Sequence, residues 1–294
     1  MAQHVVVGIG EVLWDMLPGG KQLGGAPANF AYHANALGAR GVVVSRVGGD
    51  DAGREILRRL ESLGLDARYV ATDPAHPTGR VDVRLDDRGV PDYVIARNAA
   101  WDFIRAGPDL VDLAARADAV CFGTLAQRSP ASRDAVRAFV DATRPSCLRV
   151  FDVNLRQSYF DRETVHGGLL ASDVLKLNDA ELPVLAGLLG IGGEGGDALR
   201  EVLLKYDLRL IAFTRGPNGS VLYTRDRTSD HPGSPPGAIA DTVGAGDAFT
   251  AALVAGLLEG QDLDRINASA NRLAGYVCSR PGATPPIPAE FRTG

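Results

Sequence analysis

The sequence lacks any apolar run long enough to cross a lipid bilayer. A transmembrane helix needs about 20 consecutive apolar residues, and the longest apolar stretch of this 294-residue chain, near residues 248–258, is far shorter. The first residues, MAQHV, carry no basic flank of the kind that opens a signal peptide. We therefore expect no membrane partner.

Cysteine is scarce, and neither sign of charge dominates. Cys121, Cys147 and Cys278 are widely spaced and match no metal-ligand spacing. We expect them to be buried free thiols, which suits the reducing cytoplasm. The 31 basic and 36 acidic residues give a formal net charge of −5 without a long run of either sign. This balance argues against nucleic acid as a partner.

Two common nucleotide-binding motifs are also missing. No segment fits the Walker P-loop, Gly-x-x-x-x-Gly-Lys-Ser/Thr. Gly190, Gly192 and Gly195 have the spacing of a dinucleotide fingerprint, but a helical pattern precedes them where a strand is required. Gly8 and Gly10 follow an expected strand without the third glycine. The glycine patterns therefore give little support to an NAD-dependent enzyme.

Short β-rich runs alternate with helical patterns along most of the chain, which predicts an α/β fold with a mostly parallel sheet covered on both faces. Residues 27–37 are expected to form a helix, because Pro27 suits a first turn and Gly38 suits a helix end. Residues 229–237, rich in Pro and Gly, are expected to be a loop. The expected core strands are 4–9, 42–47, 119–122, 148–153, 173–177 and 208–213.

One region departs from this alternation. Apolar Val81, Val83 and Leu85 alternate with polar residues, residues 86–89 form a turn signal, and an apolar run returns at 90–95. This pattern predicts an antiparallel hairpin with one polar face. With residues 11–23 it is expected to form a small β-sheet lid, spanning about 11–23 and 76–100, on a single domain of residues 1–294. Such a lid would keep water away from a reactive group.

The segment Asp241-Thr242-Val243-Gly244-Ala245-Gly246-Asp247 carries the strongest chemical signal. A glycine-rich turn at the start of a helix exposes backbone N–H groups, and the positive end of the helix dipole favours an anion, phosphate above all. A carboxylate beside an anion site is repelled by the anion, so its presence there calls for a functional explanation. The best explanation is that the carboxylate takes the proton from a hydroxyl that attacks a bound phosphoryl group. Asp247 is therefore a candidate general base.

Three further motifs follow or lie near expected strands. Residues 24–29, GGAPAN, open a helix behind Asp15, and their amide and carboxylate groups suit a polyhydroxyl ligand, although a plain helix start is an equal alternative. Asn178 and Glu181, three residues apart, could hold a hydrated magnesium ion or form a helix capping box. Residues 214–219, TRGPNG, could contact a nucleotide or form a plain turn.

Taken together, these blocks resemble the ribokinase-like (pfkB) carbohydrate kinases over nearly the whole chain, and the N-terminal half is most similar to bacterial fructokinases. The resemblance implies a three-layer, Rossmann-like α/β fold with a mostly parallel sheet and a small β lid. The matching blocks stand in the family's order: GEVLWD at 10–15, LGGAPANFA at 23–31, VGGD at 47–50, NDAE at 178–181 and DTVGAGD at 241–247.

The resemblance also implies roles for individual residues. Asp247 would be the catalytic base, and the amides of Gly244, Ala245 and Gly246 would form an anion hole. Asn178 and Glu181 would place Mg²⁺ through water. The sugar would contact Asp15, Gly25 and Asn29. ATP would lie against Thr214, Arg215, Gly216 and Gly219, with Asn271 near the purine. Potassium, which the family often binds near the anion hole, would lie near Asp241, Thr242 and residues 282–284.

The sugar itself is less well determined by the sequence. Arg97 follows the hairpin, and Asp152, Asn154 and Arg156 end a core strand. Similar 2-keto-3-deoxygluconate kinases use arginines near both regions to bind a carboxylate, and fructokinases also carry arginines there. The GGAPANFA form favours fructose, phosphorylated on a primary hydroxyl.

Several alternatives stay open. A 2-keto-3-deoxygluconate kinase or a ribokinase would keep the same fold and mechanism. A non-catalytic sugar- or nucleotide-binding protein and an NAD-dependent oxidoreductase are rivals from other classes. The exposed strand edges of the lid sheet could also pair between subunits and give a homodimer.

Overall fold

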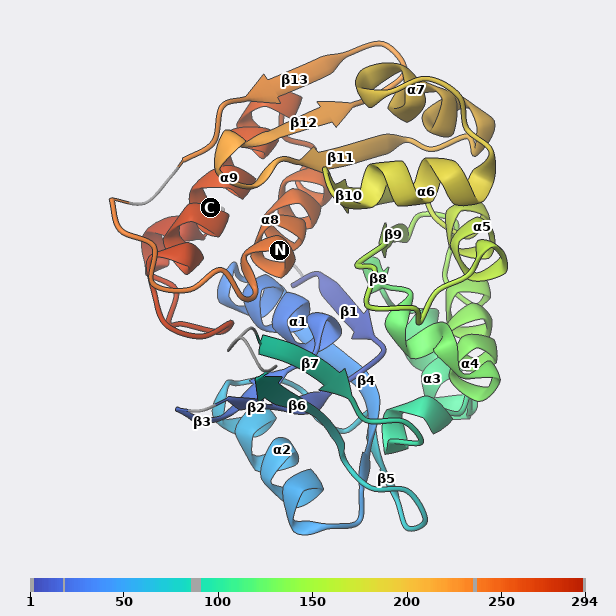
Figure 1. The fold of residues 1–294 in the computed structure, drawn as a ribbon, viewed down its shortest axis with the longest axis vertical. Helices are drawn as coiled ribbons and strands as arrows, with labels where there is room; N and C mark the ends of the chain where they lie inside the picture. The colour runs from blue at the N-terminus through green and yellow to red at the C-terminus, as the bar shows by residue number, and fades with distance from the viewer. Residues whose placement is uncertain (1–2, 18, 86–90, 235–236, 293–294) are drawn as a thin grey trace.

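A computed structural model describes residues 3–17, 19–85, 91–234 and 237–292, and its main feature is a nine-stranded sheet (Figure 1). In the described residues, no helix is both long and apolar enough to span a membrane. The strands of the large sheet are β1 (Val5–Ile9), β4 (Arg40–Gly48), β5 (Val70–Asp73), β8 (Ala119–Phe122), β9 (Leu148–Asp152), β10 (Val174–Asn178), β11 (Leu210–Thr214), β12 (Ser220–Tyr223) and β13 (Thr228–His231).

The strand order of this sheet is β13-β12-β11-β10-β9-β8-β1-β4-β5. Every neighbouring pair from β11 to β5 is parallel, whereas β12 pairs antiparallel with both β11 and β13. The chain runs outward from β1 to β4 and β5 and later returns to place β8 on the other side of β1. Such a reversal opens a crevice at the carboxyl ends of the strands, where open α/β sheets bind ligands.

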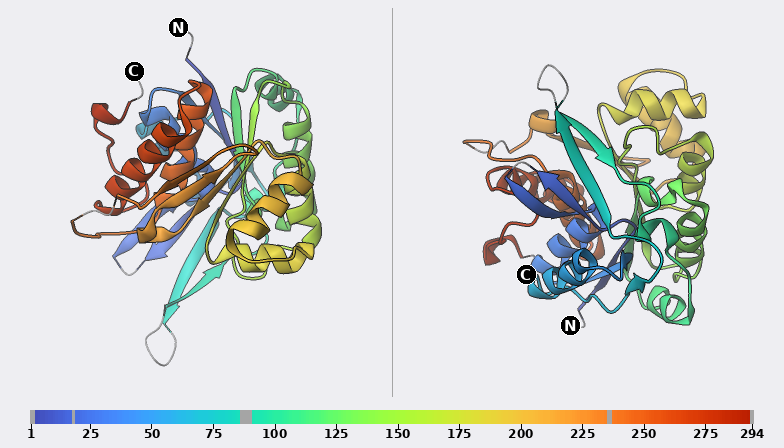
Figure 2. Two further views of the ribbon diagram at one scale, coloured as in Figure 1. Left: turned by 90° about the horizontal axis from the view of Figure 1, so that it is seen from above. Right: turned by 60° about the horizontal axis from the view of Figure 1, so that its bottom comes forward.

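Helices cover both faces of the large sheet. Figure 2 shows α8, α9 and α1 on one side and the helices from α3 to α7 on the other. The helices are α1 (Ala26–Ala36), α2 (Asp51–Ser62), α3 (Pro108–Ala114), α4 (Pro130–Asp141), α5 (Arg162–Leu170), α6 (Glu181–Leu189), α7 (Gly195–Lys205), α8 (Ala245–Leu258) and α9 (Leu263–Cys278), with short 3₁₀ turns η1 (Ala100–Phe103), η2 (Leu125–Arg128), η3 (Gly216–Asn218) and η4 (Ala289–Phe291).

The two faces of the sheet explain the apolar composition of its strands. Side chains alternate between faces along a strand, so a strand covered on both sides must be apolar throughout. In β1, Val7 and Ile9 pack in the core under α3–α7, whereas Val6 packs with Phe30 of α1 and Ala248 of α8. All of these side chains are buried. This double burial fixes the amino-terminal turns of α1 and α8 against the same sheet.

A second, four-stranded sheet projects from the end of the molecule nearest β1 and β4 (Figures 1 and 2). Its order is β3-β2-β6-β7, with β2 and β6 parallel and the two outer pairs antiparallel. Its strands are β2 (Leu13–Leu17), β3 (Gly20–Gly24), β6 (Gly79–Leu85) and β7 (Pro91–Ile95). The sequence predicts this sheet from the same two segments. The turn signal at 86–89 lies outside the described residues.

One local expectation is wrong. Residues 229–237 were expected to be a loop, but Thr228–His231 forms strand β13. Its residues pair antiparallel with β12, from Ser220↔His231 to Tyr223↔Thr228. Hydrogen bonds to a neighbouring strand have overridden a weak local preference, which is common in sheets.

Candidate active site

The candidate site lies at the carboxyl ends of the parallel strands. Glu11 follows β1, Gly123 follows β8, and Asp152, Asn178 and Thr214 are the last residues of β9, β10 and β11. Parallel strands place their carboxyl ends at one edge of the sheet, so these residues face a shared crevice. The first turns of α1 and α8 close the crevice from the other side, and the two helices pack against each other.

The glycine-rich turn before α8 depends on glycine at position 244. Gly244 has φ +79°, in the left-handed region, and a Cβ there would lie 2.8 Å from Cα of Ala283. No side chain caps the N-terminus of α8 in the described structure. An uncapped helix start keeps its first amides available and directs its dipole toward the crevice. A helix start of this kind can hold an anion.

Asp247 stands in the first turn of α8, and Asn29 in the first turn of α1 holds its carboxylate. Asn29 Nδ2 donates to Asp247 Oδ2 over 2.8 Å. The pKa of Asp247 is raised to about 7, because burial and the nearby charge of Asp152 together outweigh the lowering effect of the Asn29 hydrogen bond. A carboxylate with a pKa near neutrality can accept a proton at physiological pH, as a general base must.

Cavities lie on both sides of this carboxylate. Asp247 lines a narrow cavity together with Glu11, Asp152 and Asn154. The preceding residue, Gly246, lines a much larger cavity of about 440 Å³. The chain therefore passes from one cavity to the other between two consecutive residues at the start of α8.

The large cavity contains most of the residues expected to bind ATP. Its walls include Asn178, Thr214, Gly216, Gly219, Thr242, Ala245, Gly246 and Asn271. Arg215 is not among the lining residues, because its guanidinium turns to Asp230 at 2.5 Å. Glu181 does not line this cavity either. The structure thus brings together the turn after β11, the turn before α8 and four residues of α9.

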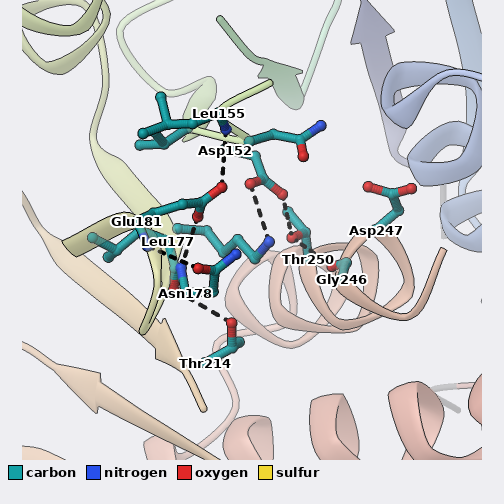
Figure 3. Close-up of polar contacts among 12 residues, drawn as sticks. Asp152, Leu155, Leu177, Asn178, Glu181, Thr214, Gly246, Asp247 and Thr250 are labelled. Atoms are coloured by element: carbon teal, nitrogen blue, oxygen red, sulfur yellow. Dashed lines mark hydrogen bonds and ion pairs between the residues drawn. The ribbon is translucent and has the colours of Figure 1, made fainter. Parts of the chain in front are cut away.

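Asn178 and Glu181 form the capping box that the sequence left as an alternative. Asn178 Oδ1 accepts from the Glu181 amide at 2.9 Å, and Glu181 Oε2 accepts from the Asn178 amide at 2.8 Å. Glu181 Oε1 accepts a third bond from the Leu155 amide at 2.9 Å (Figure 3). Burial raises the pKa of Glu181. The two residues do not share a helix face, as a spacing of three could suggest, since Asn178 ends β10 and only Glu181 belongs to α6.

The five residues expected to bind sugar do not themselves line the narrow cavity, although Ala26, next to Gly25, and Asp247, the hydrogen-bond partner of Asn29, do. Asp15 lies on β2, and its carboxylate packs against Gly24, where a Cβ would lie 2.2 Å from Oδ2. Burial raises the pKa of Asp15 to about 6, and Arg156 works in the opposite direction. Gly25 has φ +111°, and a Cβ there would lie 2.4 Å from the carbonyl oxygen of Glu11. Glycine is therefore required where the chain turns into α1.

The arginines expected near the sugar differ in their surroundings. Arg97 is exposed, stacks 5.4 Å from the Tyr159 ring and has no ion pair in the described residues. Arg156 is also exposed, and its guanidinium donates a hydrogen bond to the Leu155 carbonyl at 3.3 Å. Arg156 lowers the pKa values of Asp15 and Asp247, which places its charge near both carboxylates. Of the two, Arg156 is thus the arginine that acts on the site.

Sequence reasoning missed Glu11 and Lys176. Glu11 is only 4% exposed, and burial raises its pKa to about 7. Lys176 is buried within β10, and its Nζ lies 3.1 Å from Asp152 Oδ1. The signal for Lys176 was a charged residue inside the otherwise apolar run VLKL of a core strand. A charge at such a position is costly unless it is paired or functional.

The turn that was expected to bind potassium is linked to the C-terminal segment. Asp241 accepts from the Val243 amide at 3.0 Å and from the Gly282 amide at 3.1 Å. His33 of α1 donates through Nε2 to the Ala283 carbonyl at 2.9 Å. The segment around residues 282–284 therefore lies beside Gly244, as the resemblance implies.

Among the described residues, no group of three or more His, Cys, Asp or Glu side chains could hold a metal ion. A divalent ion carried on the phosphates of a nucleotide in the large cavity would meet Asn178 at the cavity wall, with Glu181 behind it, and both could contact the ion through water. The chemistry of the two side chains fits that role, because each contributes oxygen atoms.

Known carbohydrate kinases resemble this chain over most of its length. The model of the pfkB family of carbohydrate kinases matches residues 18–290. A fructokinase from Klebsiella pneumoniae is 30% identical over 90% of this chain and 88% of its own length. The structure of an uncharacterized sugar kinase from Pyrococcus horikoshii in complex with ATP has a TM-score of 0.79 at 28% identity, covering 95% of this chain and 94% of its own.

An Arabidopsis thaliana ribokinase complexed with ribose and ATP has a TM-score of 0.81 at 24% identity, covering 98% of this chain and 96% of its own. At this identity the likeness concerns the fold alone. The expected ribokinase-like fold is confirmed, and so is the expected resemblance to the family.

Proposed function

Because the chain belongs to the pfkB family of carbohydrate kinases, we propose that it transfers the γ-phosphoryl group of Mg-ATP to a primary hydroxyl of a small neutral sugar, with fructose as the first choice. The observation that carries this proposal is the position of Asp247. Its carboxylate lines the narrow cavity, while the preceding Gly246 lines the cavity of about 440 Å³. A kinase base must stand between an acceptor site and a donor site in this way.

The mechanism assigns one task to each feature of the α8 turn. Asp247 takes the proton from the sugar hydroxyl as the oxygen attacks the γ-phosphorus of ATP. The new P–O bond forms, the bond from the γ-phosphorus to the bridging oxygen breaks, and ADP leaves with that oxygen. The amides of Gly244, Ala245 and Gly246 would stabilise the negative charge on the transferring group, which is where preorganised dipoles contribute most.

The nucleotide is assigned to the large cavity. Thr214, Gly216, Gly219 and Asn271 line it, and the similar sugar kinase from Pyrococcus horikoshii is known in complex with ATP. Mg²⁺ enters as part of Mg-ATP, with Asn178 and Glu181 as water-mediated contacts. Arg215 would act on the nucleotide only if it left Asp230, so we give it no direct contact.

Fructose is preferred over a sugar acid because of the charge near the acceptor. Glu11, Asp152 and Asp247 place three carboxyl groups in the wall of the narrow cavity, and the charge of Arg156 acts on Glu11 and Asp247. A substrate carboxylate would add a fourth negative charge to this group. A neutral polyol instead offers donors to the carboxylates. The similarity to fructokinases points the same way.

The small sheet is proposed to act as a lid over the sugar. Its strand β2 carries Asp15, so movement of the sheet would move a sugar contact. Strands β3 and β7 are its edges, and pairing of such an edge between two copies would give the expected homodimer. The three free cysteines fit the cytoplasmic location that we propose.

The decisive experiment is ADP release from Mg-ATP with fructose, ribose, 2-keto-3-deoxygluconate and adenosine. Each acceptor is tested in potassium and in sodium buffer. We expect a strong preference for fructose, with higher turnover in potassium if Asp241 and Thr242 help to bind that ion. A preference for the keto acid would overturn the choice of sugar but keep the mechanism. No ADP with any acceptor would contradict the proposed activity.

A further inference from the structure

We propose that Lys176 is a further catalytic residue, whose ammonium group stabilises the negative charge of the transferring phosphoryl group, and that Asp152 and Thr250 position it. This inference rests on the kinase function proposed above and extends it to a residue outside the α8 turn. Four features of the structure support it: the contact of Lys176 with the start of α8, its position between the two cavities, its contacts with Asp152 and Thr250, and its burial.

Lys176 directs its ammonium group toward the anion site. A Cβ placed on Gly246 would lie 3.1 Å from Lys176 Nζ, so this nitrogen is in close contact with the backbone that opens α8. Lys176 also lines the large cavity, together with Asn178, Ala245 and Gly246. A cation and the positive end of a helix dipole repel each other. Their convergence on one wall is favourable when an anion binds between them.

The Lys176–Asp152 ion pair also connects the two cavities. Lys176 lines the large cavity and Asp152 lines the narrow one, and the two charged groups are 3.1 Å apart. The two cavities thus meet a second time at this ion pair between β9 and β10, in addition to the Gly246–Asp247 step. A phosphoryl group that moves from nucleotide to sugar must pass this boundary. The ammonium group therefore lies near the path of the transferred group.

Asp152 and Thr250 hold the ammonium in place. Asp152 Oδ1 takes the ion pair with Lys176, and its other oxygen, Oδ2, lies 3.2 Å from Thr250 Oγ1 (Figure 3). The Thr250 hydroxyl also lies 2.9 Å from the Gly246 carbonyl oxygen, so it ties Asp152 to the first turn of α8. Lys176, Asp152 and Thr250 are all buried. Little freedom is left to the lysine side chain.

A purely structural role explains this pair poorly. Removing two charges from water costs several kcal/mol for each ion, and such pairs contribute little net stability. Of the 31 basic residues only three are lysines, and the other two, Lys21 and Lys205, lie outside both cavities. Burial works to lower the pKa of Lys176, but Asp152 and Glu181 outweigh it and raise the pKa. The lysine stays charged at the boundary.

The proposal predicts a loss of turnover rather than of ATP binding. Lys176→Met should lower kcat about 100- to 1,000-fold, the effect of removing one preorganised charge-stabilising group. The KM for ATP should change much less, because the interaction is strongest when charge develops on the phosphoryl group. Lys176→Arg should recover part of the lost turnover. Lys205→Met is the matched control and should behave as wild type.

Two further measurements separate catalysis from folding. Lys176→Met leaves Asp152 buried without its cation, so the double variant Lys176→Met/Asp152→Asn is made as well, and thermal unfolding verifies that each variant is folded. Calorimetry then measures the binding of ADP alone and of ADP with aluminium fluoride. Aluminium fluoride mimics the transferring phosphoryl group in the transition state. We expect the Lys176 variants to keep ADP affinity and to lose affinity for the aluminium fluoride complex.

The outcomes are distinguishable from a failure of the proposed function. If wild type releases ADP with a sugar and the folded double variant keeps near-native kcat, Lys176 has no catalytic role. If wild type phosphorylates none of the sugars, the calorimetry still tests the lysine, because it needs no acceptor. Equal loss of ADP and aluminium fluoride binding would overturn the proposal, since Lys176 would then hold the nucleotide rather than the transferred group.

Discussion

The Asn29 amide donates a hydrogen bond to the carboxylate of Asp247 across 2.8 Å, although the two residues lie 218 positions apart in the chain. Each stands in the first turn of a helix, α1 and α8, and the two helices pack against each other. The residue that the sequence assigned to the sugar is thus also a partner of the proposed base. Asn29 Oδ1, the other polar atom of this amide, is buried without a hydrogen-bond partner among the described residues and can accept from a ligand.

Replacing Asn29 by alanine should slow the reaction most at low pH. The Asn29 hydrogen bond favours the ionised form of Asp247, so its loss should raise the Asp247 pKa above about 7. A larger fraction of the base is then protonated at pH 7. The acidic limb of the kcat profile should move to higher pH, with recovery near pH 9. Asn35→Ala, at the other end of the same helix, serves as control. If the acidic limb of the kcat profile does not move in Asn29→Ala, Asn29 does not set the pKa of Asp247.

Replacing Asp247 by asparagine should remove the base while keeping its shape. We expect kcat to fall about 100- to 10,000-fold, the usual range for a positioned general base. Fructose binding, measured by calorimetry without turnover, should change little, because asparagine keeps an oxygen that Asn29 can reach. The exposed Asp264→Asn on α9 is the control. Near-native turnover in the folded Asp247→Asn variant would show that another group accepts the proton.

Replacing Glu11 by glutamine should flatten the pH dependence of stability. The pKa of Glu11 is about 7 in the folded protein, above its usual value of 4.5. Between these values the folded state binds more protons than the unfolded state, so wild-type stability falls as pH rises. The free energy of unfolding lost between pH 5 and pH 8 should shrink by about 2 kcal/mol in the variant.

Urea unfolding at the two pH values checks this prediction. The pKa of Asp247 is also raised, so the Glu11→Gln variant should keep part of the pH dependence of stability seen in wild type. The exposed Glu259→Gln provides the comparison for a glutamate at the surface. A variant slope equal to that of wild type would mean that Glu11 does not carry the proton taken up on folding.

Shortening the hairpin tests the lid. Residues 83–93 are replaced by a short Gly-Ser link between Asp82 and Val94, which are paired in the sheet. Val81 and Ile95 keep their packing around Trp101. The KM for sugar should rise, and ATP hydrolysis without sugar should increase, because water reaches the phosphoryl group more easily. Unchanged values for both quantities would show that the hairpin does not close over the site.

The sequence predicted the architecture well where patterns are local. The expected strand at 119–122 agrees with β8, and the strands and helices around it agree within a few residues. Such runs are apolar because both faces of the sheet are covered, so the pattern of the chain reports its burial directly. Strand β13 was missed because its residues TSDH carry no apolar alternation. Only its pairing with β12 makes it a strand.

Candidate site residues could be proposed from the sequence where a backbone motif contains them. The small residues at 244–246 and the acid behind them form one contiguous signal, and Gly244 indeed needs a left-handed conformation. Contacts between distant segments gave no such signal. The partner of Lys176 is 24 residues away on the neighbouring strand, and Arg215 turns to Asp230 on β13. Which way a long charged side chain turns depends on partners that tertiary structure brings near.

Replacing Arg156 by alanine should distinguish a neutral acceptor from an acidic one. Arg156 favours the ionised forms of Asp15 and Asp247, so its removal should raise both pKa values and lower turnover of fructose at pH 7. We expect this loss to stay below about tenfold and to diminish at higher pH. A guanidinium that binds a substrate carboxylate contributes about 1.5–3 kcal/mol, or roughly 10- to 150-fold in kcat/KM.

The comparison is therefore kcat/KM for fructose and for 2-keto-3-deoxygluconate, at pH 7 and pH 9, in wild type and Arg156→Ala. Arg144→Ala, which loses an ion pair with Asp118 near the opposite edge of the sheet, is the control. A small loss for fructose that recovers at pH 9 supports an electrostatic role toward the carboxylates. A large loss for the keto acid alone, independent of pH, would make Arg156 a carboxylate clamp. In that case the acceptor would be a sugar acid, and the three carboxyl groups around the cavity would have to be protonated or turned away when it binds.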